Sequence, residues 1–313
     1  WHNRSRAWRS RDGASPGSVL GLGICELNGV LHGESSAFLE LFETIGGPAH
    51  AIHVDQEPLV PTARTLVEQI RRTEAEYAAI IEDLMGYLLK ASPPPLPEEW
   101  IFAAALLHGL KRTPLSETYD LLSRVGVFRS GPADALLLTA NAESQRPLRH
   151  RRLGYAMQVH GHWLGRAVPT IQAWTKASFE PIVCGLDDMA RDYRELVGLI
   201  EAAPGRMPAH VLICNLMSTV GEDDLQTYMG FDRPMSATLA SIYGKDLNLM
   251  LHDLARDHGV AIVDVDAITA EIGGQRNLPD GTHGSGALYA EVRAEVAHIL
   301  RGRGVPGFGP ALG

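Results

Sequence analysis

The chain has 313 residues, 45% of them hydrophobic, and its 28 Lys and Arg against 37 Asp and Glu give a net charge of −9. This acidic balance argues against nucleic acid or an anionic membrane surface as a partner, because binding phosphates requires a basic face. No apolar run approaches the roughly 18 residues that a membrane span needs. We expect one large α/β domain over residues 17–313.

The N-terminal residues 1–16 are basic, but no apolar segment follows them as it would in a secretory signal. We expect them to form a disordered tail outside the fold. The chain has three cysteines, too few for a disulfide framework, which favours a reducing, cytoplasmic compartment. Of the three, Cys184 and Cys214 lie in ordinary core patterns and are predicted to be structural.

Strand and helix patterns alternate from residue 17 onward, which is typical of an α/β fold with a mainly parallel sheet. Short apolar runs predict five strands, at residues 19–24, 50–54, 136–139, 211–214 and 261–265. Apolar residues at helical spacing predict helices after Ser35 and over residues 186–200, 239–254 and 288–299. We therefore expect a three-layer sandwich built on a five-stranded, mainly parallel sheet.

Residues from about 60 to 130 are too many for an ordinary connection between a strand and a helix. The pattern predicts an amphipathic helix from Leu66 to Leu88, a break at Pro93-Pro94-Pro95 and an apolar helix over residues 101–107. We interpret them as a helical insertion. It would form a lid or the interface of a homodimer, or it would add core helices without a functional role.

The most specific motif is Asp280-Gly281-Thr282-His283, which follows the last predicted strand and directly precedes the last helix. A loop histidine that has an aspartate three residues before it can act as a general base, because the carboxylate stabilises the imidazolium. His283 and Asp280 are therefore candidate catalytic residues.

The run from His252 to Leu300 resembles the last block of the SGNH/GDSL hydrolase superfamily, whose Asp-x-x-His loop supplies two members of a Ser-His-Asp triad. The nucleophile of that family lies just after the first strand. The matching stretch here is Gly23-Ile24-Cys25-Glu26-Leu27-Asn28-Gly29, with Cys25 in place of the serine. The third block of the family, Gly-x-Asn-Asp, corresponds to residues 139–142, where Asn141 matches.

This resemblance implies an SGNH/flavodoxin-like fold and a divergent hydrolase, thioesterase or acyltransferase that uses a Cys25-His283-Asp280 triad. A thiol is easier to activate than a hydroxyl, so His283 would deprotonate Cys25, and the thiolate would attack an ester or thioester carbonyl. The Cys25 backbone N–H and the Asn141 side chain would bind the oxyanion, a role for which Asn215 competes. Such an activity would suit secondary-metabolite or polysaccharide biosynthesis.

A basic group that includes Arg149 and Arg152 is predicted either to be a solvated turn or to bind an anionic part of the substrate. The substrate would then be a small-molecule acyl donor such as a coenzyme A thioester or an acyl carrier protein thioester. We expect no cofactor of the protein's own. We also expect no metal, because His160 and His162 lack further ligands at a suitable spacing.

Two alternatives remain open at this stage. Gly21-Leu22-Gly23 after a strand and Asp55 at the end of the next strand resemble the first motifs of S-adenosylmethionine-dependent methyltransferases. That interpretation leaves Asp280 and His283 without a role. The other alternative is a catalytically inactive SGNH-like binding module in which Cys25 is a core residue, as cysteines often are.

Overall fold

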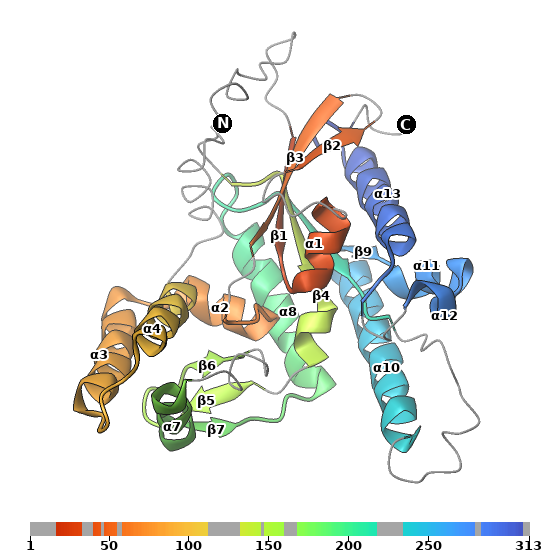
Figure 1. Ribbon diagram of the computed structural model, residues 1–313. Helices are drawn as coiled ribbons and strands as arrows, with labels where there is room; N and C mark the ends of the chain where they lie inside the picture. Colours follow the sequence, from red (N-terminus) through yellow and green to blue (C-terminus); the bar gives the residue numbers. More distant parts are fainter. Residues whose placement is uncertain are drawn as a thin grey trace.

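The structure is a computed structural model that describes residues 17–32, 40–44, 47–54, 58–111, 132–144, 147–159, 168–217, 234–278 and 283–308. Its centre is a six-stranded sheet with helices on both faces (Figure 1). The strands lie in the order β2 (Glu40–Thr44), β3 (Gly47–Val54), β1 (Gly17–Leu22), β4 (Ala135–Thr139), β8 (His210–Cys214) and β9 (Ala261–Val263). Every neighbouring pair is parallel except β2 with β3.

All five predicted strands lie in the parallel part of this sheet, but the prediction of five strands was wrong by one. Residues 40–44, expected to belong to a helix after Ser35, form the antiparallel edge strand β2. A short apolar run cannot be assigned to helix or strand from its periodicity alone. Pairing with β3, which begins at Gly47 opposite Thr44, decides the outcome.

The five parallel strands, numbered along the chain, lie in the order 2-1-3-4-5, which is the flavodoxin-like order. It differs from the 3-2-1-4-5-6 order of dinucleotide-binding sheets. The order reverses between β1 and β4, so connections leaving these two neighbouring strands diverge. Doubly wound sheets bind ligands outside the carboxyl ends of the strands at such a point.

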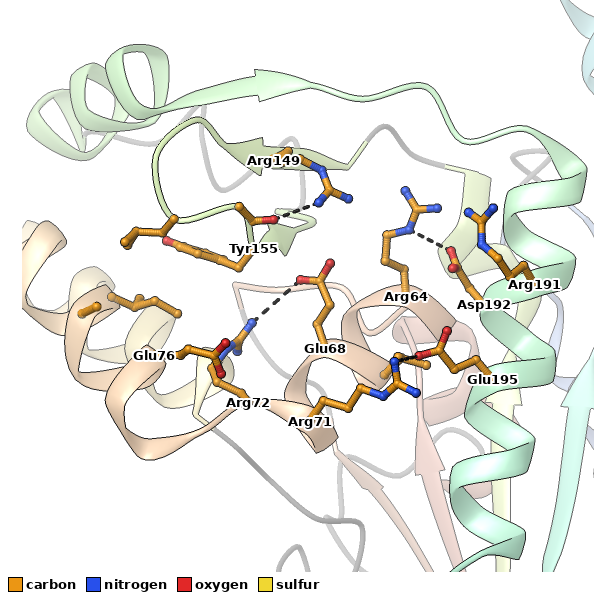
Figure 2. Close-up of a pocket in the computed structure, with 15 residues that line it drawn as sticks. Arg64, Glu68, Arg71, Arg72, Glu76, Arg149, Tyr155, Arg191, Asp192 and Glu195 are labelled. Carbon is orange, nitrogen blue, oxygen red and sulfur yellow. Dashed lines mark hydrogen bonds and ion pairs between the residues drawn. The ribbon is translucent and has the colours of Figure 1, made fainter.

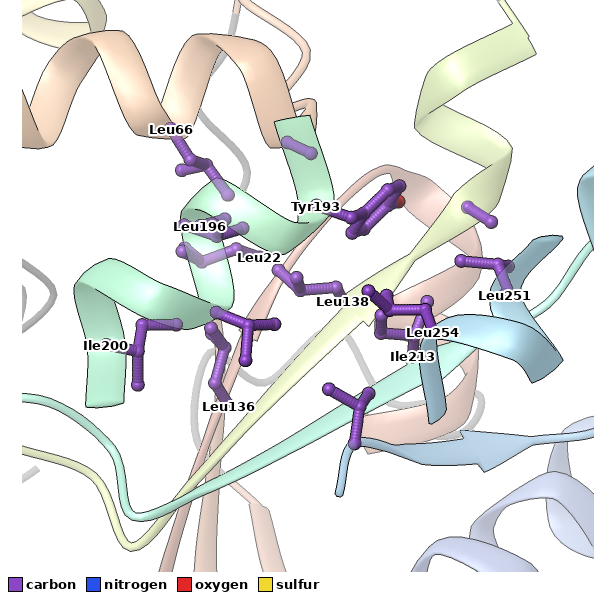
Figure 3. Close-up of a cluster of buried hydrophobic side chains, with 14 of the residues drawn as sticks. Leu22, Leu66, Leu136, Leu138, Tyr193, Leu196, Ile200, Ile213, Leu251 and Leu254 are labelled. Atoms are coloured by element: carbon purple, nitrogen blue, oxygen red, sulfur yellow. The ribbon is translucent and has the colours of Figure 1, made fainter. Parts of the chain in front are cut away.

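Buried side chains alternate between the two faces of the sheet and form two cores. On one face, α1 (Cys25–His32), α11 (Val265–Ile272) and α13 (Gly286–Gly302) cover Val19, Leu137 and Val263. On the other, α2 (Ala63–Arg71), α8 (Leu186–Glu201) and α10 (Pro234–His258) cover Leu22 and Leu138 (Figure 3). Burial on both faces explains why the central strands β1 and β4 are almost continuously apolar.

The predicted insertion contains α2, α3 (Glu74–Lys90) and α4 (Pro97–Leu110), and the region after residue 111 lies outside the described residues until 132. The single amphipathic helix that we expected is two helices. They separate at Thr73, whose hydroxyl caps α3 and whose N–H donates to the Glu76 carboxylate at 2.7 Å. Whereas α2 belongs to the main sandwich, α3 and α4 do not pack into its two cores.

Helices α3 and α4 share a third core with α7 (Pro169–Ser178) and a small antiparallel sheet. This sheet has the order β6 (Ala156–Met157), β5 (Leu148–His150) and β7 (Phe179–Pro181). The predicted insertion is therefore part of a larger unit, to which residues 148–159 and 168–181 contribute. None of the described helices has both the length and the apolar composition that crossing a membrane requires.

Asp83 on α3 joins the parts of this third core. Its carboxylate accepts hydrogen bonds from Trp174 Nε1 at 2.9 Å, His150 Nε2 at 3.0 Å and Arg152 Nη2 at 2.7 Å. His150 is 2% exposed, and its Nδ1 accepts the Leu153 N–H at 3.1 Å, which leaves the proton on Nε2 for Asp83. Two buried N–H groups thus depend on a single carboxylate.

We predict that Asp83→Ala lowers the free energy of unfolding by about 2–4 kcal/mol, because it leaves the buried His150 and Trp174 donors without an acceptor. Arg152→Ala is the matched control. It removes the third partner of the same carboxylate. Because the Arg152 side chain is 66% exposed, its loss should lower the free energy of unfolding by less than about 1 kcal/mol. Urea denaturation measures both, and equal losses would contradict the assignment of Asp83 as the buried link.

Candidate active site

The turn that leaves β1 passes very close to the end of β4. A Cβ on Gly23 would lie 2.5 Å from Thr139 Cγ2 and 2.6 Å from Leu27 Cδ1, so any larger residue there would displace these side chains. The next segment is α1, which begins at Cys25. The predicted nucleophile is therefore the first residue of a helix at the switch point of the sheet, although its side chain lies outside the described part of the structure.

The segment that leaves β4 is the 3₁₀ helix η1 (Ala140–Ser144), and its side chains reach both faces of the sheet. Asn141 Nδ2 donates a hydrogen bond to Glu26 Oε2 on α1. Glu143 accepts the N–H of Ala63, the first residue of α2, at 2.7 Å. This short segment therefore connects the two helices that start at the carboxyl edge.

Sequence analysis missed Glu26, which is only 7% exposed. Burial raises the pKa of its carboxyl group from 4.5 to about 7, although the hydrogen bond from Asn141 and the charge of His283 both oppose the shift. The signal that could have identified it is an acidic side chain next to Cys25 in an otherwise apolar stretch. A carboxyl group with this pKa can exchange a proton near neutral pH.

His283 lies in the segment before α13 and is exposed. The Gly284 N–H donates to Tyr289 Oη at 2.9 Å, and the Tyr289 ring occupies the space that a Cβ on Gly29 of α1 would need. Tyr289 thus holds the residue after His283 against α1. The electrostatic effect of His283 on Glu26 agrees with this placement. Asp280 lies outside the described residues.

Asn215, which competed with Asn141 for the oxyanion role, follows β8. Its Nδ2 donates to Asp264 Oδ1 at 2.8 Å, and its Oδ1 accepts the Asp266 N–H at 3.1 Å. Asp264 in turn caps α11. Both ends of the Asn215 amide therefore hold the start of α11, while the Asn141 amide contacts the helix that begins at Cys25.

The two cysteines predicted to be structural occupy packed positions. Cys214 is 2% exposed, and burial, with a further contribution from the charge of Glu26, raises the pKa of its thiol well above the ordinary value. Cys184 accepts a hydrogen bond from Arg64 Nη1 at 3.0 Å, and burial raises the pKa of its thiol as well. Neither environment favours a thiolate.

The two arginines that were predicted to bind substrate do not share a site. Arg149 lines a cavity of about 460 Å³ (Figure 2). Arg152 does not line it and forms an ion pair with Asp83 at 2.7 Å. The described residues that line this cavity include none of Glu26, Asn141 and His283, so it is separate from the candidate active site.

Other predicted features fall where the structure gives no test. Residues 1–16, Asp55, His160 and His162 lie outside the described residues. Within the part of the chain that is described, no group of three or more His, Cys, Asp or Glu side chains is arranged to hold a metal ion.

No family model matches this chain, and no curated protein is significantly similar to it. Solved structures that resemble it include two variants of Axe2, an acetyl-xylooligosaccharide or acetylxylan esterase from Geobacillus stearothermophilus, one of which is a catalytic mutant. Each of these two matches covers 95% of this chain and 95% of the Axe2 chain, with 11% sequence identity and a TM-score of 0.36. Similarity at this level does not establish a common fold or activity, and the proposal below depends on the geometry of this chain.

We predict that the raised pKa of Glu26 makes stability depend on pH. Between pH 4.5 and about 7 the folded protein holds a proton that the unfolded chain releases. The free energy of unfolding therefore falls as pH rises through this range, by at most about 1.4 kcal/mol per pH unit for this group, and levels off above it.

Glu26→Gln removes the titrating group while it keeps the size of the side chain. Its stability relative to the unmodified protein should rise between pH 5 and 7 and then stay constant to pH 8, as measured by urea denaturation. The pKa of Glu143 is also raised to about 7 by burial, but this carboxyl group is present in both proteins and cancels in the difference. A difference that does not change with pH would contradict the prediction.

Proposed function

We propose that this protein transfers acyl groups from an ester or a thioester through Cys25, with His283 as the general base and Asp280 as the residue that orients it. The main support is the convergence of three distant segments beside Glu26. Glu26 follows Cys25 directly, accepts a hydrogen bond from Asn141 and is electrostatically coupled to His283. This is the arrangement that the resemblance to the SGNH/GDSL superfamily implies.

In the proposed mechanism His283 takes the proton of the Cys25 thiol, and the thiolate attacks the acyl carbonyl carbon. The N-terminus of α1 favours negative charge on its first residue, which would assist formation of the thiolate. The tetrahedral oxyanion accepts hydrogen bonds from the Cys25 N–H and the Asn141 amide. His283 then donates the proton to the leaving group, and water or an acceptor amine or hydroxyl takes the acyl group from Cys25.

Glu26 has a supporting role in this proposal. A carboxyl group with a pKa of about 7 is partly ionised at neutral pH. In its ionised form it would stabilise the imidazolium of His283 while the thiolate exists. In either form it holds the Asn141 side chain against the start of α1.

One observation favours the competing interpretation, an inactive binding module. The hydrogen bond to Glu26 uses an N–H of Asn141 that could otherwise bind an oxyanion. The methyltransferase alternative has no comparable support, because the strand order is flavodoxin-like.

The reactivity of Cys25 with iodoacetamide separates the two interpretations. We expect the alkylation rate of Cys25, followed by peptide mass spectrometry, to titrate with an apparent pKa well below the roughly 8.5 of a free cysteine. His283→Ala should lower the rate at pH 7 by about tenfold or more, because the thiolate loses its base.

His298→Ala is the matched control, since His298 is an exposed histidine near the end of the same helix that follows His283. This variant should leave the alkylation rate unchanged. A Cys25 that reacts no faster than Cys184, or that is insensitive to His283→Ala, would refute the thiol mechanism and favour the binding module.

A further inference from the structure

The cavity of about 460 Å³ lies between α2, α3, α8 and the turn that joins β5 to β6 (Figure 2). Its volume lies within the range of about 300–1,000 Å³ that is typical of small-molecule sites. Aliphatic side chains of Val67, Ile80 and Leu153 form part of its wall. The remaining wall is strongly charged, with five arginines and four carboxylates, in a chain whose net charge is −9.

Most of these arginines are neutralised by nearby carboxylates. Four of them form ion pairs, namely Arg64 with Asp192 at 2.7 Å, Arg71 with Glu195, Arg72 with Glu68 at 3.9 Å and Arg191 with Asp188 at 2.6 Å. Among the described residues, no carboxylate lies within ion-pair distance of the fifth, Arg149. Arg149 is therefore the wall arginine without a close carboxylate partner, and Glu76, whose carboxylate accepts hydrogen bonds from Thr73, is the described wall carboxylate that forms no ion pair.

Arg149 is held in a defined position. It lies on β5, and its Nη1 donates to the Gly154 carbonyl at 2.8 Å, at the end of the turn before β6. Figure 2 shows its guanidinium directed toward the space between Glu68 and Arg64. A guanidinium has five N–H donors, and the bond to Gly154 uses one of them. An oriented guanidinium of this kind is suited to binding a carboxylate or phosphate through two parallel hydrogen bonds.

Glu68 faces Arg149 across the cavity without forming an ion pair with it. Burial raises the pKa of the Glu68 carboxyl group, while the Ala156 N–H and the charge of Arg149 oppose this shift. The Ala156 N–H donates to Glu68 Oε2 at 2.6 Å, so the carboxylate is tied to β6. An anion that enters the cavity would approach Arg149 from the same space.

We propose that this cavity binds an organic anion, separately from the acyl-transfer site. A phosphate or carboxylate head group accepts hydrogen bonds from Arg149, and an uncharged body lies against Val67, Ile80 and Leu153. The volume of the cavity exceeds what a bare inorganic anion fills, which is why the ligand has a body as well as a head group.

Calorimetric titration with three probes that share one body tests this proposal. Phenyl phosphate and benzoate carry the two candidate head groups, and phenol carries neither. We expect at least one charged probe to bind and phenol to bind at least tenfold more weakly. The comparison of phenyl phosphate with benzoate identifies the head group. Equal binding of phenol, or no binding of either charged probe at millimolar concentration, would overturn the proposal.

Variants locate the site. Arg149→Ala should weaken binding of the tighter probe by about tenfold or more, since it removes a charge-assisted hydrogen-bond donor. Arg151→Ala is the matched control, because Arg151 lies two residues after Arg149 in the turn that follows β5, is 53% exposed and forms an ion pair with Glu180 outside the cavity. The control variant should bind the probe as the unmodified protein does.

Two further variants keep the test independent of folding defects and of the proposed activity. Glu68→Gln keeps an acceptor for Ala156 and removes a negative charge from the wall, so it should bind the probe at least as tightly as the unmodified protein. Cys25→Ala should bind it equally well, whatever the outcome of the thiol experiments. Weaker binding by Glu68→Gln, or loss of binding by Cys25→Ala, would contradict an anion site at Arg149 that is separate from Cys25.

Discussion

The hydrogen bond between Asn141 and Glu26 joins the two segments that diverge from the switch point of the sheet. It forms because β1 and β4 are neighbours although more than a hundred residues separate them in the chain. The interaction is made at a cost, since Glu26 is buried and its proton is held to about pH 7. The contribution of this carboxyl group to stability falls as pH rises from 4.5 to about 7, and pKa values perturbed in this way are concentrated at functional sites.

The position of the third segment depends on close packing around Tyr289. Glycine at positions 29 and 284 allows the tyrosine ring to lie against α1 and against the residue after His283. Ser285, which caps α13, also donates to Asn277 Oδ1 at 2.7 Å. The start of α13 is thus tied both to α1 and to the helix α12 (Gly274–Asn277). These contacts bring a histidine from the end of the chain to a helix that starts at residue 25.

The sequence predicts the parallel strands and the long helices of the sandwich, because they are buried on one or two faces and carry strong periodic patterns. It does not predict β2, whose short run becomes a strand only through pairing with β3. Nor does it reveal Asp83 as the centre of the third core, since that carboxylate binds residues 67 to 91 positions away. Local periodicity carries no information about such partners.

The candidate site was predictable to a similar extent. Asn141 was selected because it matches the third block of the SGNH/GDSL superfamily after the third parallel strand, and His283 because it closes an Asp-x-x-His motif before the last helix. Glu26 was not, since the burial that raises its pKa comes from packing near Cys214 and α13, which are remote in sequence. The separation of Arg149 from Arg152 also depends on tertiary contacts, namely the ion pair that Asp83 makes with one of them.

The central claim is that the start of α1 forms one reactive site with Asn141 and His283. The most direct test is the intact mass of the protein after incubation with a panel of acyl thioesters, followed by peptide mapping. The account predicts an added mass of one acyl group, located on Cys25 and absent from Cys25→Ala. Protein without an adduct across the whole panel, or acylation distributed equally between Cys25 and Cys184, would contradict it.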